Sequence, residues 1–184
     1  MLNLYNKLLK KYGKQNWWPC VTNNKRFEIC LGAILTQNIS WKNVEKVIKI
    51  LNEKNLVNKD KLRKISLKKL ASLIKSSGYH NQKAKKIKEF IKFLDSGKKV
   101  TRENLLNVWG IGKETADSML LYAYNRPCFV IDNYTKRLLS KSNYCKEDIS
   151  YDELQNLITN KIPKDVKLYK EFHALIVENA KNSI

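Results

Sequence analysis

The sequence contains few residues that interrupt helices or form disulfide bonds, and it lacks a long apolar run. Its 184 residues include 3 prolines, 6 glycines and 4 cysteines, and no apolar run approaches the about 20 residues that a membrane-spanning helix needs. The cysteines are widely separated, whereas zinc and iron–sulfur sites use clustered thiolates. With only 2 histidines as well, the composition gives no indication of a metal site.

A secretory signal is also missing. Residues 1–12 alternate leucine with lysine and asparagine, without an apolar block or a small-residue cleavage site. We therefore expect a cytoplasmic protein that does not insert into a membrane.

Negative charge is scarce relative to positive charge. The chain has 36 Lys and Arg against 17 Asp and Glu, a formal net charge of +19. Such an excess favours a polyanionic partner, and nucleic acid is the commonest polyanion in a cell. A lysine-rich proteome produces a similar excess, so the charge indicates a nucleic-acid partner only together with a motif.

Strand patterns are nearly absent, and apolar residues recur at helical spacing almost throughout. Residues 128–131 form the one short apolar run that resembles a strand, and nothing in the sequence pairs with it. Thr101 and Ser150 stand where N-caps are expected before later helices. The sequence predicts an all-α fold.

Two amphipathic segments are joined by Gly110-Ile111-Gly112, within residues 105–116. The glycines allow a tight turn, and the backbone amides at the start of the second helix can bind a phosphate. Ile111 is expected to plug the turn into the core, and Lys113 adds positive charge. Without a preceding strand, this glycine pair favours a helix-hairpin-helix over a dinucleotide-binding turn.

A single carboxylate follows this hairpin. Asp132 comes after two apolar residues and before a basic helical segment. A carboxylate beside a phosphate-binding site repels DNA, and such an unfavourable placement indicates a chemical role. Asp132 is equally well placed as a helix N-cap, and the two roles can coexist.

Several motifs in one order then resemble the endonuclease III-like superfamily of helix-hairpin-helix DNA glycosylases. They are the segment ending in Gln37-Asn38, the G-Y-H-N-Q-K-A loop at 78–84, the hairpin with its following V-I-D, and F-H-A-L-I at 172–176. The resemblance implies a two-lobed helical fold with an active-site cleft between the lobes. One lobe comprises 1–25 and 130–184; the other comprises 26–129, with the hairpin at about 102–120. It also implies that Asp132 is the catalytic residue.

The sequence departs from the bifunctional members of this superfamily at one position. They carry a Schiff-base lysine two residues after the second hairpin glycine, where this chain has Glu114. We therefore expect a monofunctional, hydrolytic glycosylase. Two alternatives stay open: a bifunctional glycosylase and abasic-site lyase acting on oxidised or mismatched pyrimidines, and a non-catalytic DNA-binding module.

Tryptophan is concentrated in two places, Trp17-Trp18-Pro19 and Trp41. Core packing can explain any tryptophan, but Trp17-Trp18-Pro19 lacks helical periodicity and Trp41 follows the polar segment 36–38. Aromatic faces at such positions can stack on a flipped base. With Glu114, the pattern resembles the 3-methyladenine glycosylase branch. This resemblance implies that Trp17 and Trp41 sandwich the base and that Trp18, Pro19 and Glu114 shape its pocket. This chain departs from the branch at one position: some members carry a lysine in the final helix after F-H-x, where this chain has Leu175.

The resemblance also implies which partner the protein binds, which residues contact it, and which cofactors are expected. The partner is double-stranded DNA containing damaged bases, so the protein is expected to be nucleoid-associated and to act as a monomer. No cysteines follow the final helix, where many members bind an iron–sulfur cluster, so no cluster is expected; a structural monovalent cation at the hairpin is compatible with the family. At the interface, the hairpin is expected to contribute Gly110, Ile111, Gly112, Lys113 and Thr115. The wedge that fills the flipped nucleotide's space is expected from Gln37 or Asn38 and from Tyr79 or His80, and the basic surface includes Lys83 and Lys136.

Overall fold

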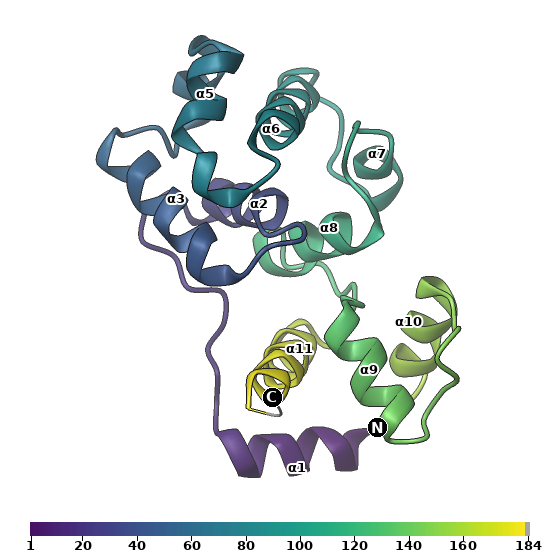
Figure 1. Cartoon of the computed structure of the whole chain (residues 1–184). Helices are drawn as coiled ribbons and strands as arrows, with labels where there is room; N and C mark the ends of the chain where they lie inside the picture. Colours follow the sequence, from purple (N-terminus) through teal and green to yellow (C-terminus); the bar gives the residue numbers. More distant parts are fainter. Residues whose placement is uncertain (183–184) are drawn as a thin grey trace. The chain divides into compact units, whose positions relative to one another are not determined.

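In the computed structural model, which describes residues 1–182, every regular element is a helix (Figure 1). The predicted all-α fold is therefore confirmed. The chain divides into a terminal unit, Met1–Pro19 with Asn125–Ile184, and a central unit, Cys20–Tyr124. The lobe boundaries expected from the sequence were 25/26 and 129/130. None of the helices in the described part of the chain combines the length and apolarity that crossing a membrane requires.

The terminal unit is built around its last helix. Its helices are α1 (Leu2–Tyr12), α9 (Asn133–Lys141), α10 (Tyr151–Thr159) and α11 (Val166–Lys181). Helix α11 packs against both α1 and α9. Phe172 of α11 lies at the centre of an aromatic core, with its ring centroid 5.6 Å from Phe129 and 5.7 Å from Tyr5 in edge-on geometry. Such buried rings contribute both apolar area and specific contacts.

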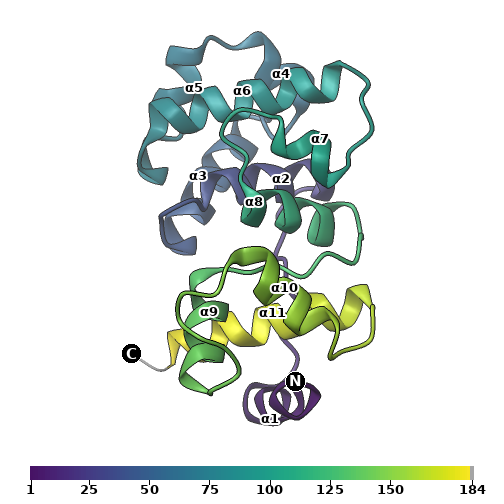
Figure 2. The same cartoon turned by 90° about the vertical axis from the view of Figure 1, so that its right-hand side faces the viewer.

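The central unit surrounds a buried helix. Its elements are α2 (Lys25–Leu35), α3 (Trp41–Glu53), α4 (Lys59–Lys64), α5 (Leu67–Leu73), η1 (Lys75–Ser77), α6 (His80–Asp95), α7 (Arg102–Leu106), α8 (Lys113–Ser118) and η2 (Met119–Ala123). Residues 27–35 of α2 are all buried, because α2 packs against α3, α6, α8 and η2 (Figures 1 and 2). A helical segment that is covered on all sides is apolar all round, as residues 27–35 are apart from Glu28.

The local signals for helix starts are confirmed at both positions that the sequence indicated. The Thr101 hydroxyl accepts a hydrogen bond from the backbone N–H of Asn104 at the start of α7. Ser150 and Glu153 form a reciprocal capping box at the start of α10. These interactions satisfy amides that have no partner inside the helix.

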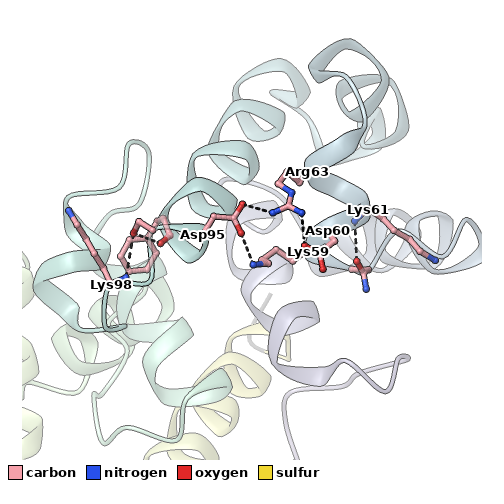
Figure 3. Close-up of polar contacts among 9 residues, drawn as sticks. Lys59, Asp60, Lys61, Arg63, Asp95 and Lys98 are labelled. Atoms are coloured by element: carbon pink, nitrogen blue, oxygen red, sulfur yellow. Dashed lines mark hydrogen bonds and ion pairs between the residues drawn. The ribbon is translucent and has the colours of Figure 1, made fainter.

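Ion pairs on the surface join α4 to the end of α6 (Figure 3). The Asp95 carboxylate lies 2.5 Å from Lys59 Nζ and 3.4 Å from an Arg63 nitrogen, and Arg63 also lies 3.1 Å from Asp60. Because all four side chains remain partly exposed, from 26% for Asp95 to 61% for Asp60, screening by water leaves these pairs little stabilising effect. The contact of α4 with α6 depends instead on buried residues such as Leu62.

Candidate functional site

Asp132 lies at the junction between a buried extended segment and helix α9. Its Oδ1 accepts a hydrogen bond of 2.7 Å from the backbone N–H of Thr135, so Asp132 is the N-cap of α9. The preceding residues, 129–131, are buried but belong to no sheet. Side chains of α10 take the place of a partner strand: the Gln155 amide donates to the Phe129 carbonyl, and the Ile131 N–H donates to the Tyr151 hydroxyl oxygen. These contacts fix the position of Asp132.

The second carboxylate oxygen of Asp132 faces His173 on α11. Its Oδ2 lies 3.4 Å from His173 Nε2, and the two side chains are only 13% and 6% exposed. Burial acts to raise the pKa of Asp132, but the hydrogen bond and charge of His173, with the Thr135 amide, outweigh it and hold this pKa below its ordinary value. The result is a nearly buried carboxylate that stays ionised, which can stabilise a positive charge brought next to it.

The aromatic segment lies beside this pair. The Trp17 ring centroid is 4.8 Å from that of Trp18 and 6.0 Å from that of His173, and both tryptophans are half-buried. Just before them, the Gln15 N–H donates to a Glu171 carboxylate oxygen of α11. The aromatic faces of Trp17 and the imidazole of His173 thus gather in the terminal unit with Asp132.

Of the other expected pocket residues, Trp41 and Glu114 belong to the central unit and Pro19 to the terminal unit. Trp41 begins α3 and is half-buried, with its indole N–H 3.0 Å from a Glu45 carboxylate oxygen. Glu114 is exposed in the first turn of α8. Pro19, at the end of the terminal segment, is exposed as well.

The hairpin between α7 and α8 has the expected geometry. Gly110 adopts a φ of +83°, a conformation that residues with a side chain rarely adopt. Ile111 is 5% exposed and plugs the turn into the core, while Gly112 and Lys113 are exposed at the start of α8. The turn can therefore present backbone amides and a lysine to an anion.

Gln37 occupies a different place from the one expected of a wedge. Its Nε2 donates to the Gly110 carbonyl at 3.1 Å and to the Thr115 hydroxyl at 2.9 Å, and its Oε1 accepts from Lys86 Nζ at 2.5 Å. Thr115 itself is buried. The polar atoms of the partly buried Gln37 side chain and the buried Thr115 hydroxyl are thus hydrogen-bonded within the protein.

Asn38 and Tyr79 are the residues expected at the wedge that do project. Asn38 is exposed with a left-handed φ of 57°, and Tyr79 is 69% exposed with a φ of 43°. His80 follows as the first, half-buried residue of α6. Left-handed conformations at such positions are uncommon and often mark functional loops.

The expectation that Lys83 contacts DNA does not fit the structure. Lys83 is 2% exposed, and its Nζ donates to the Leu35 and Ser77 carbonyl oxygens, each at 2.6 Å. Burial is the main cause that lowers its pKa, to about 8, with a smaller contribution from nearby Lys86. The ammonium caps the end of α2 and the η1 turn, because backbone carbonyls there need donors. Lys136 is half-buried and donates to the Ile149 carbonyl.

The partner of Asp132 was not identified from the sequence. In the sequence, His173 is one of two histidines, too few to indicate a metal site, and a member of the F-H-A-L-I segment. A signal for its role was present, because it is the one ionisable residue among the buried positions 172–176 of α11. As for metals, residues 1–182 contain no group of three or more His, Cys, Asp or Glu side chains arranged to hold an ion.

Comparisons with known proteins agree on a family. Residues 31–164 match the HhH-GPD superfamily of base excision DNA repair proteins. A Methanocaldococcus jannaschii protein named "Putative DNA repair glycosylase" is 44% identical, over 97% of this chain and 86% of its own length. The structure of H. pylori 3-methyladenine DNA glycosylase bound to 1,N6-ethenoadenine has a TM-score of 0.82 and 33% identity, covering 100% of this chain and 96% of that one.

More distant similarity extends to endonuclease III. The Bacillus subtilis endonuclease III is 27% identical over 79% of this chain and 68% of its own length. A trapped covalent complex of endonuclease III with DNA has a TM-score of 0.84 at 22% identity, covering 96% of this chain and 82% of that one. At that identity the likeness concerns the fold alone.

Proposed function

Because the chain belongs to the HhH-GPD superfamily of base excision DNA repair proteins and is a DNA repair glycosylase of that superfamily, we propose that it removes alkylated bases of the 3-methyladenine type from double-stranded DNA by hydrolysis. The observation that carries this proposal is the 33% identity to the H. pylori 3-methyladenine glycosylase over essentially the whole of both chains. The tryptophans Trp17, Trp18 and Trp41 support it, because an electron-rich aromatic face binds a positively charged alkylated purine well.

In the proposed mechanism the damaged nucleotide leaves the base stack before reaction. The exposed side chains of Asn38 and Tyr79 are suited to fill the vacated space. The Gly110–Gly112 turn binds a backbone phosphate through its amides, with Lys113 adding charge. The resemblance to the 3-methyladenine branch assigns Trp17 and Trp41 to stacking on the base, and Trp18, Pro19 and Glu114 to its border.

Asp132 then performs the chemistry. Departure of the base takes the bonding electron pair with it and leaves oxocarbenium character on the deoxyribose, as in glycoside hydrolysis. The ionised carboxylate stabilises this cation and orients the water whose oxygen adds to the sugar carbon while its proton is released. An N3-alkylated adenine leaves as a neutral base, so no general acid is needed. Glu114 stands where a Schiff-base lysine occurs, and this favours hydrolysis over lyase chemistry.

Release of bases from a panel of damaged duplexes tests which damaged base the protein removes. We expect release of 3-methyladenine, 7-methylguanine or 1,N6-ethenoadenine, and none of oxidised pyrimidines, because the proposed pocket relies on stacking with a cationic or extended purine. Chromatography of the released bases provides the measurement. The same reactions run with borohydride should trap no protein on DNA.

Two outcomes would contradict this assignment in different ways. Release of oxidised pyrimidines with a borohydride adduct that disappears in Lys113→Ala indicates the bifunctional enzyme. Tight DNA binding without release of any base indicates a binding module.

The contact between His173 and Asp132 predicts a particular pH dependence. In His173→Phe, burial becomes the dominant influence on Asp132 and raises the pKa of this carboxyl. A carboxylate with a lowered pKa keeps its activity as the pH falls, until the pH reaches that pKa. We therefore expect the acid limb of base release to move to higher pH in His173→Phe, with about tenfold slower release at neutral pH, equivalent to one lost hydrogen bond.

His173→Gln is the matched variant, because glutamine keeps an N–H donor but cannot carry charge. Its acid limb should lie between those of the wild type and His173→Phe in single-turnover profiles. Superimposable profiles for all three proteins would rule out an influence of His173 on Asp132.

A further inference from the structure

One side-chain amide connects two parts of the central unit that are expected to touch DNA. Gln37 lies beside Asn38 in the loop between α2 and α3, and its side chain reaches the hairpin between α7 and α8. Its Nε2 donates both of its hydrogens, one to the Gly110 carbonyl at 3.1 Å and one to the Thr115 hydroxyl at 2.9 Å. Both hydrogen-bonded groups belong to the hairpin or the first turn of α8.

The third contact orients this amide. Lys86 Nζ, from α6, donates to Gln37 Oε1 at 2.5 Å. A cation requires the oxygen at that end, so both N–H groups must point to the hairpin. A carboxylate of the same shape would set a negative oxygen against the Gly110 carbonyl. The site therefore selects glutamine specifically.

Lys86 also fits the turn by shape. A Cβ added to Gly110 would lie 2.5 Å from Lys86 Cγ and 2.8 Å from its Cδ and Cε. The aliphatic part of Lys86 thus covers the turn where Gly110 adopts its φ of +83°. The neighbouring Lys85 places its ammonium 4.4 Å from the centroid of the Trp109 ring. Two consecutive lysines of α6 consequently hold the hairpin turn.

We propose that Gln37, oriented by Lys86, is a positioning residue that connects the phosphate-binding hairpin to the loop carrying Asn38. Binding of the DNA backbone by the hairpin is thereby coupled to insertion of Asn38 into the DNA. The proposal rests on the proposed binding of DNA by this hairpin and not on which base is excised. It assigns Gln37 a role other than the wedge, since entering the DNA would cost all three of its hydrogen bonds. It also assigns Lys86 an indirect role, through Gln37, in place of a phosphate contact.

Three variants separate these roles. Gln37→Met removes the hydrogen bonds at similar length, Gln37→Glu keeps the shape but loses both donors, and Lys86→Met keeps the stem over Gly110 but loses the ammonium. Lys92→Met, an equal loss of charge on an exposed part of α6 where Lys92 pairs with Glu89, is the matched control. Binding of each protein to an undamaged duplex and to abasic-site DNA is measured across a range of salt concentrations, with the unfolding midpoint recorded for every variant.

If Gln37 and Lys86 together position the hairpin, three results are expected. Each of the three variants binds both duplexes about 5- to 10-fold more weakly, as expected for losing hydrogen bonds that hold a site in shape. The slope of affinity against salt is unchanged in Lys86→Met, because no phosphate contact is lost. In the double variant Gln37→Met with Lys86→Met, the loss is no larger than in either single variant, the signature of residues that act as a unit. Lys92→Met binds like the wild type.

Other results would overturn the proposal. A salt slope smaller by about 0.9 in Lys86→Met identifies a direct phosphate contact, as do additive losses in the double variant. Normal affinity of Gln37→Met for undamaged DNA, with loss of the fluorescence change of 2-aminopurine placed next to the abasic site, identifies Gln37 as the wedge. If Gln37→Met fails to fold, Gln37→Glu carries the same comparison. Since none of these measurements requires base release, an unexpected substrate contradicts the proposed function alone.

Discussion

Asp132→Asn is expected to lower the rate of base release by about 10³-fold, the scale found when a preorganised charge or donor is removed from an active site. The expectation follows from the geometry of the carboxylate, which is nearly buried, faces His173, and has its pKa held below the ordinary value. Asparagine keeps the size and loses the charge that would stabilise the sugar cation. Its side-chain oxygen can still accept from the Thr135 N–H, because asparagine is as good an N-cap as aspartate.

Single-turnover release of an alkylated base, measured beside affinity for abasic-site DNA, tests this prediction. Asp165→Asn is the matched control: Asp165 caps α11 through the Leu168 N–H in the same way, but it is exposed. We expect Asp132→Asn to retain DNA binding and the unfolding midpoint of the control while losing release. Excision at the wild-type rate by Asp132→Asn would remove Asp132 from the mechanism.

Asp117→Asn is expected to lower the free energy of unfolding by about 3 kcal/mol, as for other broken buried ion pairs. Asp117 is fully buried on α8, and its two oxygens lie 2.8 and 3.2 Å from Nε and a terminal nitrogen of Arg102 on α7. This two-pronged contact joins the two helices of the hairpin. Asparagine preserves the volume, but it has no charge and replaces one acceptor oxygen with a donor facing the guanidinium.

Urea unfolding of Asp117→Asn, compared with Arg63→Met, measures the effect. Arg63 takes part in the surface ion pairs of Figure 3, with Asp60 and Asp95, and its loss should leave the unfolding midpoint close to that of the wild type. DNA affinity should fall in Asp117→Asn as well, since the hairpin helices lose their link. Equal midpoints for the two variants would show that the Arg102 contact gives no more stability than a solvated pair.

Much of the fold could be predicted because the signals for it are local. Apolar residues at helical spacing, the caps at Thr101 and Ser150, and the glycine pair of the hairpin each act within a few residues of chain. All of these predictions are confirmed. The sequence offered no strand to pair with the apolar run at 128–131, and the structure assigns this run to no sheet. The sequence did not show that Gln155 and Tyr151 bind its backbone.

The roles of individual basic and polar side chains could not be predicted in the same way. Lys83 looked like a surface cation and is instead a buried donor to two backbone carbonyls. Gln37 was one of two alternatives for the wedge, with Asn38, and its side chain instead binds the hairpin, although Gly110 is 73 positions away in the chain. A lysine on a helix has the same sequence signature whether it faces solvent or a carbonyl, because its partner comes from another element.

The sequence by itself determined that this chain is helical, that its hairpin turn is built on two glycines, and that a carboxylate follows the turn, because these properties depend on backbone preferences and on neighbours along the chain. The tertiary structure alone decided which groups meet: His173 with Asp132 in the terminal unit, and Gln37 with Lys86 and Gly110 in the central unit. The physical reason is that burial and charge at a site are set by side chains from several helices, whose packing no local pattern records.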